Sequence, residues 1–283
     1  MSKLILPFLG AVALSSFAFL PACSGGDTSD STASGDTDTD TDTDTDTDSD
    51  TDTDTQADTY NVSGTAMDFA SKAPATTGLC VTAVDPGPAI TGGVPTVLAS
   101  TTVGAAGAFS LTAIATKPAL GLVVIVQDCA NEGTVYPSGT GISSSTLATL
   151  NNGDTLDGRT ALSISTAAEN AMVGSFAAVG ASWDPATQGM LAGFVFDNTG
   201  APIGNATVSG ASSTTYYADS TNTDGIFGAG ATANTMTDPA LGFFAIPGAP
   251  ITTYSAAAQG YTFDTFTGGS ISGLALFVAI YAN

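Results

Sequence analysis

Short apolar stretches that alternate with polar residues run through the chain from about residue 60 to its end. The alternation has the period of two that places successive side chains on opposite faces of a β-strand. The segments with this pattern predict strands at Tyr60 to Phe69, Leu79 to Val84, Ala108 to Ile114, Leu122 to Asp128, Leu191 to Phe196, Ala206 to Ser209, Phe243 to Ile246, Thr252 to Ala257, Tyr261 to Phe266 and Leu274 to Tyr281. Short strands between turn residues are typical of β-sandwiches, so we expect an all-β protein.

One segment between these strands has helical spacing. Thr166-Ala-Ala-Glu169 has the sequence of a capping box, and the apolar residues after it recur at roughly helical intervals: Ala167, Met172, Val173, Phe176 and Val179. This predicts an amphipathic helix from about Thr166 to Val179 that ends near Gly180. We expect its apolar face to pack on a sandwich or to bridge two of them.

The two halves of the strand-rich region contain related segments. Gly64-Thr-Ala-Met-Asp-Phe69 corresponds to Gly193-Phe-Val-Phe-Asp-Asn198, and Gly107-Ala-Phe-Ser-Leu111 corresponds to Gly242-Phe-Phe-Ala-Ile246. The order of these segments is the same in both halves. The sequence therefore predicts a divergent repeat: a first β-sandwich domain at residues 59–160, a helical linker at 161–189 and a second β-sandwich domain at 190–283.

The second half resembles a known family. A strand, a tight turn at Asn198-Thr199-Gly200 and a second strand are followed by Thr223-Asp-Gly-Ile-Phe227, Pro250-Ile-Thr-Thr-Tyr254 and Gly260-Tyr261. Over residues 190–267 this pattern resembles the carboxypeptidase regulatory-like domain, and the first half matches it more weakly. The resemblance implies transthyretin-like, Ig-like sandwiches of about seven strands and a non-catalytic module of secreted or surface proteins.

The amino-terminal segment predicts export and a lipid anchor. Lys3 precedes an apolar run from Leu4 to Leu20, which has the length of a signal-peptide core and is short for a membrane span. Leu20-Pro21-Ala22-Cys23 resembles the lipobox of bacterial lipoproteins, in which the cysteine is acylated after the leader, here residues 1–22, is removed. The alternative is an ordinary signal peptide with an incidental cysteine. Ser24 after Cys23 suggests sorting to the outer membrane.

Residues 23–58 form an acidic spacer. From Asp36 to Thr55 aspartate alternates with threonine, interrupted only by Ser49, and no apolar residue is available for a core. We therefore expect a disordered, extended tether. Specific calcium binding is the alternative, but the run lacks the turn glycine and the closing bidentate acid of a calcium loop.

The charge balance limits the partners. The whole chain has 26 acidic residues against 4 lysines and arginines, a net charge of −22. Because nucleic-acid binding needs clustered Lys and Arg, we expect no nucleic-acid partner. Membrane attachment would depend on the acyl chains, since an anionic lipid surface repels an acidic protein.

The sequence offers little catalytic chemistry. It contains no histidine, which excludes Ser-His-Asp and Cys-His mechanisms and histidine zinc sites. We expect no enzyme activity, no cofactor and no metal. Two weaker signals indicate a calcium site or a covalent crosslink. Asn222-Thr-Asp224-Gly225 resembles part of a calcium loop, although a turn explains it better. A Lys-Asn isopeptide crosslink is a second alternative, with Lys72 or Lys117, Asn131 and Glu132 as the candidate residues.

Two cysteines remain after Cys23, and both lie at predicted strand positions or ends in the first half. Because the chain is expected to be exported, we predict a disulfide between Cys80 and Cys129, with two free buried thiols as the alternative.

Together these features predict a non-enzymatic, lipid-anchored cell-surface protein that presents β-sandwich domains for adhesion or envelope interaction, with an unidentified polysaccharide or protein partner. The alternative is a carbohydrate-binding module, which needs aromatic residues on an exposed face. The candidates are Tyr216, Tyr217, Tyr254, Tyr261 and Trp183.

Overall fold

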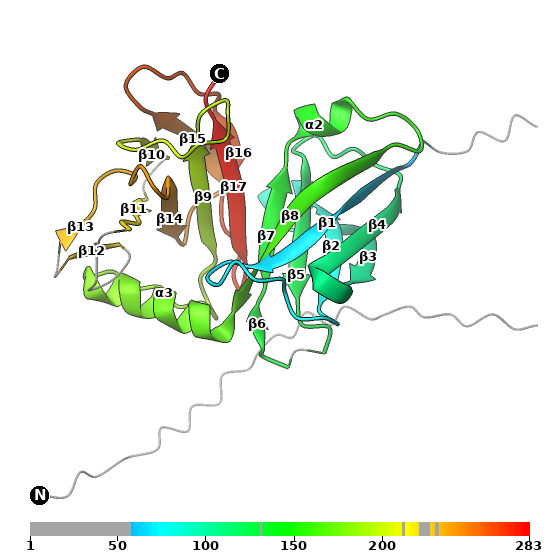
Figure 1. Cartoon of the computed structure of the whole chain (residues 1–283), viewed down its shortest axis with the longest axis horizontal. Helices are drawn as coiled ribbons and strands as arrows, with labels where there is room; N and C mark the ends of the chain where they lie inside the picture. Colours follow the sequence, from blue (N-terminus) through cyan, green and yellow to red (C-terminus); the bar gives the residue numbers. More distant parts are fainter. Residues whose placement is uncertain (1–57, 131, 211–212, 221–226, 230–231) are drawn as a thin grey trace, which may run out of the picture. The chain divides into compact units, whose positions relative to one another are not determined.

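The computed structural model describes residues 58–130, 132–210, 213–220, 227–229 and 232–283 (Figure 1). It is mostly β, which confirms the predicted fold class. The strands are β1 (Tyr60–Asp68), β2 (Cys80–Asp85), β3 (Thr96–Thr102), β4 (Ala108–Ile114), β5 (Leu122–Gln127), β6 (Val135–Tyr136), β7 (Ser138–Ile142), β8 (Thr155–Ser165), β9 (Met190–Phe196), β10 (Thr207–Ser209), β11 (Tyr216–Tyr217), β12 (Gly228–Ala229), β13 (Thr232–Ala233), β14 (Phe243–Pro247), β15 (Thr252–Ala257), β16 (Phe266–Gly268) and β17 (Ala275–Tyr281). The helices are α1 (Gly87–Ile90), α2 (Ser144–Ala148), α3 (Thr166–Ala178) and the 3₁₀ turn η1 (Ala105–Gly107).

Strands β1 to β8 form what we call the first lobe. A sheet with the order β4-β1-β8-β6 packs on the strands β3-β2-β5-β7. The buried side chains between them come from both layers, among them Val62 of β1, Leu111 of β4 and Val124 of β5, each 2% exposed or less. This is the two-layer arrangement of a β-sandwich.

Strands β9 to β17 and α3 form the second lobe. The strands β10-β15-β16 cover one face of β11-β14-β9-β17, with Leu191, Phe244 and Tyr254 buried between the layers. Helix α3 packs on the opposite face through Met172 and Phe176. The second lobe is therefore a three-layer structure.

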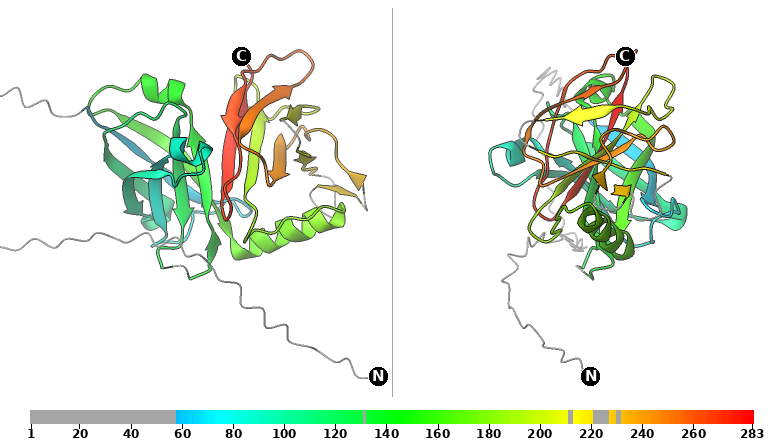
Figure 2. Two further views of the ribbon diagram at one scale, coloured as in Figure 1. Left: turned by 180° about the vertical axis from the view of Figure 1, so that it is seen from behind. Right: turned by 90° about the vertical axis from the view of Figure 1, so that its left-hand side faces the viewer.

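The two lobes share one sheet. Strand β17 pairs in parallel with β9 and also with β7, through the register Ala275↔Ser138 to Phe277↔Thr140. These contacts produce an eight-stranded sheet with the order β11-β14-β9-β17-β7-β5-β2-β3 (Figures 1 and 2). The described residues belong to one compact unit. The division into domains at residues 59–160 and 190–283 stays a prediction, and β8 extends beyond residue 160 to Ser165.

The internal repeat has a structural counterpart. In the first lobe β1 pairs antiparallel with β4 and parallel with β8, and in the second lobe β9 pairs antiparallel with β14 and parallel with β17. The register also agrees with the sequence correspondence, because Gly64 lies opposite Phe109 and Gly193 lies opposite Phe244. The same framework of three strands is thus present twice.

The repeated glycines have the same physical reason in both lobes. A Cβ atom on Gly64 would collide with the carbonyl oxygen of Arg159 in the parallel partner β8. A Cβ atom on Gly193 would collide with the carbonyl oxygen of Val278 in the parallel partner β17. These positions exclude every side chain because the facing atom is part of the backbone.

Helix α3 is close to its predicted range. It spans Thr166–Ala178, and its N-cap is Ser165, whose Oγ accepts a hydrogen bond from the N–H of Ala168 at 3.4 Å. The predicted capping box placed Thr166 at the cap, one residue too late. Helix α3 packs in a core that includes Tyr136 and Ile164 of the first lobe, so it contacts both lobes.

Several elements differ from the sequence-based prediction. Strands β3, β7 and β8 were not predicted, whereas the predicted strand Tyr261 to Phe266 forms a loop that reaches β16 only at Phe266. The predicted leader at 1–22 and tether at 23–58 lie outside the described residues, apart from Asp58. None of the described helices is long and apolar enough to cross a bilayer.

Candidate functional site

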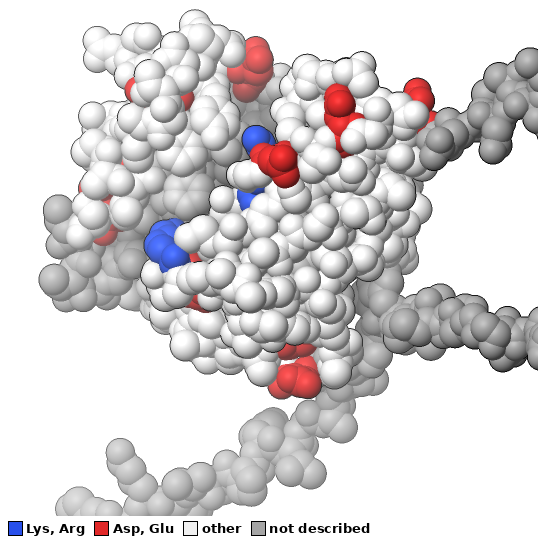
Figure 3. Space-filling model, turned by 45° about the vertical axis from the view of Figure 1, so that its right-hand side comes forward, with Lys and Arg blue, Asp and Glu red and all other residues white. Residues whose placement is uncertain are grey.

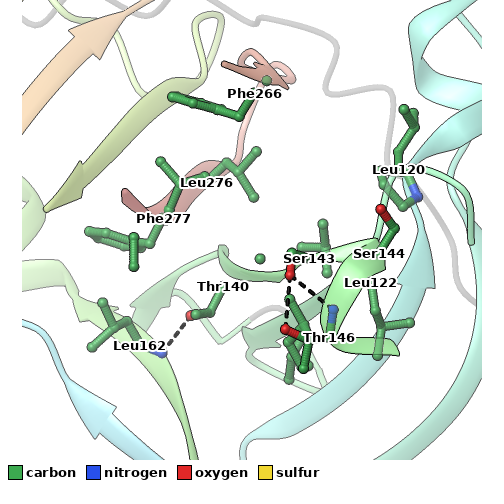
Figure 4. Close-up of a pocket in the computed structure, with 18 of the residues that line it drawn as sticks. Leu120, Leu122, Thr140, Ser143, Ser144, Thr146, Leu162, Phe266, Leu276 and Phe277 are labelled. Carbon is green, nitrogen blue, oxygen red and sulfur yellow. Dashed lines mark hydrogen bonds between the residues drawn. The ribbon is translucent and has the colours of Figure 1, made fainter. Parts of the chain in front are cut away.

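A cleft of about 1210 Å³ opens where the two lobes meet. Its lining includes β9 and β17 of the shared sheet, β8 on the face of that sheet that also holds α3, and the segment around β16 on the opposite face. Figure 4 shows part of this lining: Phe266 and Leu276 of the second lobe lie across from Leu120 and Leu122 of the first, and Phe277 points to the other side of β17, toward Leu162. The cleft exists because β17 pairs with β7, which brings the two lobes edge to edge.

Strand β7 forms the narrow junction under the cleft. On one face, the Ser138 Oγ donates to the carbonyl of Leu162 at 2.8 Å, and the Thr140 Oγ1 accepts from the N–H of Leu162 at 3.0 Å. The intervening positions, Gly139 and Gly141, have no side chains. A Cβ atom on Gly139 would lie 2.6 Å from Cγ1 of Val123, so the glycine leaves room for the Val123 side chain.

A row of aromatic rings follows the second-lobe side of the cleft. Phe69 of the first lobe lies 5.1 Å from Phe277 and 6.4 Å from Phe194 between ring centroids. Phe194 stacks on Phe196 at 5.7 Å, and Phe196 lies 5.5 Å from Tyr281. Tyr281 at the end of the row is 55% exposed. The alternation of β9 and β17 places Phe194, Phe196 and Tyr281 on one sheet face.

Two basic side chains also line the cleft. The Nζ of Lys72 lies 4.7 Å from the ring centroid of Phe69 and 5.8 Å from that of Phe194. Arg159 lies on β8, and its Nε donates to the carbonyl of Asp157 at 3.3 Å. Figure 3 shows basic side chains along the hollow between the lobes, in a surface that is otherwise white and red.

The position of Lys72 is fixed by the preceding turn. The Asp68 carboxylate accepts hydrogen bonds from the N–H groups of Ser71 and Ser165, at 2.8 and 3.2 Å. Burial raises the pKa of Asp68, but these hydrogen bonds outweigh it and the pKa lies below its usual value. For Lys72 the pKa is lowered by burial, and the charge of Asp68 opposes this effect.

The predicted aromatic contacts lie in different environments. Tyr217 and Tyr254 are 4% and 0% exposed, so the expectation that they lie on an exposed face is wrong. Their hydroxyls bind backbone atoms of Val208 and Pro250. Trp183 is also buried, and its Nε1 donates to the carbonyl of Gln188.

The other two predicted contacts remain accessible. Tyr216 is half-buried, with its ring 5.3 Å from that of Phe176 in a T-shaped contact. Tyr261 is 45% exposed and lies 6.3 Å from Phe263. The structure does not bring Tyr216 or Tyr261 into the cleft. Phe194, Phe196 and Tyr281, which sequence reasoning did not select, form the aromatic row there.

Cys80 and Cys129 form a disulfide in the structure, with an S–S distance of 2.08 Å and a Cα–Cα distance of 5.0 Å. It joins the start of β2 to the segment after β5. A second hollow of about 700 Å³ lies beside it and includes Asp68 and Asp128. The Asp128 carboxylate accepts from the N–H groups of Thr134 and Val135, at 2.8 and 3.2 Å, so it serves the loop structure.

The alternative chemistries depend largely on residues outside those that the structure describes. The Nζ of Lys117 donates to the carbonyl of Leu150, and Lys72 lies over Phe69 and Phe194. Asn131, Asn222, Asp224, Gly225 and Cys23 lie outside the described residues. Within the described ranges no three Cys, Asp or Glu side chains are placed to hold a metal ion. The cleft combines apolar area, aromatic rings and two cations, which suits binding.

No family model matches the chain, and no curated protein matches it. Comparison with solved structures finds similarities to the Bacillus anthracis TIE protein, with a TM-score of 0.25 and 12% identity. The match covers 79% of this chain and 34% of the TIE protein, so this chain spans about a third of that protein.

A shaft pilin SpaA from Lactobacillus rhamnosus GG has a TM-score of 0.25 and 13% identity, with 79% of this chain and 97% of the pilin covered. A minor pilin of Streptococcus agalactiae has a TM-score of 0.22 and 10% identity, with 79% and 95% covered. These similarities do not identify a family for the chain.

Proposed function

We propose that the protein is a non-enzymatic, lipid-anchored protein of the cell surface, and that its β-sandwich lobes present the cleft to a partner outside the cell. The observation that carries this proposal is the cleft itself. It is open and contains partly exposed aromatic rings, and its lining residues come from both lobes. Its described lining includes no histidine or cysteine to act as a nucleophile or base.

The anchor in this proposal is Cys23, which follows the lipobox-like sequence Leu20-Pro21-Ala22. The acyl chains would hold the protein at the outer membrane, because each buried methylene contributes about 0.8 kcal/mol and two chains give stable attachment. The acidic residues 24–58 would separate the lobes from the membrane. A fully extended segment of this length reaches at most about 120 Å.

Anchoring is tested by comparing the native chain with Cys23→Ala in cells grown with labelled palmitate. We expect label and membrane association in the native protein and neither in the variant. Protease added to intact cells should cleave the anchored native protein if it faces outward. Label in Cys23→Ala, or a native protein protected from protease, would contradict the proposal.

Carbohydrate binding is a second candidate function, favoured by the aromatic row in the cleft. The apolar C–H faces of sugar rings pack on aromatic side chains, and their hydroxyls bind polar groups at the rim. Phe194, Phe196 and Tyr281 provide such rings along β9 and β17, and the Thr160 hydroxyl lies on the facing strand.

A glycan array with the mature chain tests this function, with Cys23→Ala used to keep the protein soluble. Tyr281→Ala removes the exposed ring of the cleft. Tyr261→Ala is the matched control, since Tyr261 is similarly exposed and does not line the cleft. We expect binding that Tyr281→Ala weakens and Tyr261→Ala preserves. The absence of any glycan ligand would refute carbohydrate binding and leave the surface role to be tested with protein partners.

A further inference from the structure

We propose that the cleft selects acidic polysaccharides, with Lys72 and Arg159 as the residues that bind their anionic groups. This inference rests on the proposed carbohydrate binding and adds the charge of the ligand. Basic residues are rare in this acidic chain, and most of those that the structure describes lie in the cleft. Three basic residues, Lys72, Lys117 and Arg159, are described by the structure, and Lys72 and Arg159 line the cleft.

Arg159 retains binding capacity. Its side chain is exposed, and only Nε is used, as a donor to the Asp157 carbonyl at 3.3 Å. Its terminal nitrogens form no hydrogen bond or ion pair with the residues that the structure describes. A guanidinium in this state can donate two parallel hydrogen bonds to one carboxylate. The nearby Asp157 carboxylate accepts instead from the Ser63 hydroxyl.

Lys72 is placed for a different contact. It lies in a left-handed backbone conformation, with a φ of 59°, and its N–H donates to the Asp68 carbonyl at 2.9 Å. Its ammonium lies over the Phe69 and Phe194 rings at one end of the aromatic row. A sugar carboxylate that binds this ammonium would therefore have its ring beside Phe194.

The two cations are carried by backbone positions at different levels of the β1–β8 ladder. Arg159 pairs with Gly64, whereas Lys72 follows Asp68, which pairs with Ser163. Four strand residues at about 3.3 Å each separate these positions by about 13 Å. The aromatic row lies along the same stretch of the cleft. Two cations carried by separate segments beside a row of aromatic rings fit a chain of sugar rings with repeated negative groups.

Because the protein is acidic overall, only direct contacts with Lys72 and Arg159 can favour an anionic polymer. With a net charge of −22, the chain as a whole repels a polyanion. Only the ion pairs that Lys72 and Arg159 would form with carboxylates of the polymer favour its binding. An exposed charge pair changes affinity by up to about fivefold. We therefore expect modest affinity and a clear preference for charged over neutral forms of the same polymer.

The test uses polygalacturonate, which has a carboxylate on every ring, and its methyl ester, which has the same backbone without the charge. The mature Cys23→Ala chain is titrated with both by calorimetry. We expect the acid form to bind more tightly than the ester. Lys72→Gln and Arg159→Gln should each weaken binding of the acid form by about fivefold and leave ester binding unchanged.

Lys117→Gln is the matched control, because it removes the same charge outside the cleft and should have no effect. Equal binding of the acid and the ester would overturn the proposed preference for anionic polymers, but would leave the proposed carbohydrate binding intact. Equal loss in Lys117→Gln would also overturn that preference. Tight binding of an Asp-Thr peptide would identify an acidic peptide as the better ligand. If neither polymer binds, the carbohydrate function itself fails for this class of glycan.

Discussion

The first and second lobes are built on the same three-strand framework but stabilise it differently. In the first lobe a disulfide joins Cys80 to Cys129, and helices form no part of the core except Leu147 of α2. The second lobe has no cysteine and adds a helix with an aromatic cluster. The three-strand framework is the same, although one lobe has a disulfide and the other has a helix with aromatic side chains. We infer that close backbone contacts set the strand register and that the stabilising groups around it can vary.

The aromatic cluster of the second lobe centres on Phe176 of α3. Its ring stacks on Phe227 at 4.4 Å and makes T-shaped contacts with Trp183 and Tyr216, at 5.8 and 5.3 Å. Aromatic side chains bury a large apolar area each, and a pair contributes about 0.5–1.5 kcal/mol beyond that burial. This cluster stabilises the second lobe, which has no disulfide, through packing between the helix and the sheet.

Removal of the disulfide is the largest expected effect. The bridge closes a loop with a sequence separation of 49 residues. In the chain-entropy model such a loop stabilises the fold by about 4 kcal/mol. Cys80→Ala with Cys129→Ala should lower the free energy of unfolding by about this amount in urea titrations. Reductant should destabilise the native chain equally and have no effect on the double variant. An unchanged stability, or two free thiols in the denatured native chain, would contradict a stabilising disulfide in the first lobe.

Alanine at the repeated glycines should destabilise both lobes. In Gly64→Ala and Gly193→Ala the new Cβ meets a backbone carbonyl of the parallel partner strand. A carbonyl in a paired strand cannot move aside, so we expect a loss of about 3 kcal/mol in each.

Gly174→Ala is the matched control for these two variants. It lies in α3 with open space around its Cβ position, and should be neutral or stabilise by up to about 1 kcal/mol. A large effect in only one lobe would show that the two frameworks are not equivalent.

Tyr217→Phe tests a buried hydrogen bond of the second lobe. The buried hydroxyl accepts from the N–H of Val208 at 2.7 Å and donates to its carbonyl at 3.1 Å. Because the substitution leaves a buried donor without a partner, we expect a loss of about 2 kcal/mol. Tyr216→Phe should change little, since its hydroxyl has no hydrogen bond among the described residues. Equal effects of the two variants in thermal unfolding would contradict the burial of Tyr217.

The smallest expected effect is a dependence on alkaline pH in the first lobe. Burial raises the pKa of Tyr60 from 10.0 to about 12. Between these values the unfolded tyrosine loses its proton while the folded one retains it, so stability falls as the pH rises. Tyr60→Phe should reduce this fall in urea titrations below and above pH 10. A steeper fall in the variant would contradict the assignment.

The local elements were largely predictable from the sequence. The bounds of β4 and β15 agree with the prediction because their apolar alternation is clear and turn residues flank them. Strand β7 was missed because Gly139 and Gly141 remove the alternation, and β8 because its first half is polar and exposed. The loop at Tyr261 is rich in aromatic residues, which favour strands. A hydrogen bond from the Tyr261 N–H to the Ala258 carbonyl closes a turn there instead.

The cleft could not be predicted, because it depends on a pairing between distant segments. Ser138 and Ala275 are paired in the β7–β17 ladder, and no residue pattern in either strand identifies the other as its partner. That pairing brings Lys72 and Arg159 toward Phe194 and Tyr281 across the lobe boundary. The buried tyrosines illustrate the same limit, since Tyr217 and Tyr254 could not be distinguished in the sequence from exposed tyrosines.

Hydrogen exchange of the mature Cys23→Ala chain with and without polygalacturonate is the most direct test that the cleft is the binding site. Strand β8 pairs with β6 only at Ile164 and Ser165, so much of its second edge is unpaired and borders the cleft. We predict slower exchange in β8 and at the end of β17 when the polymer is present. Protection confined to the loop around Tyr261, or no protection at all, would contradict it.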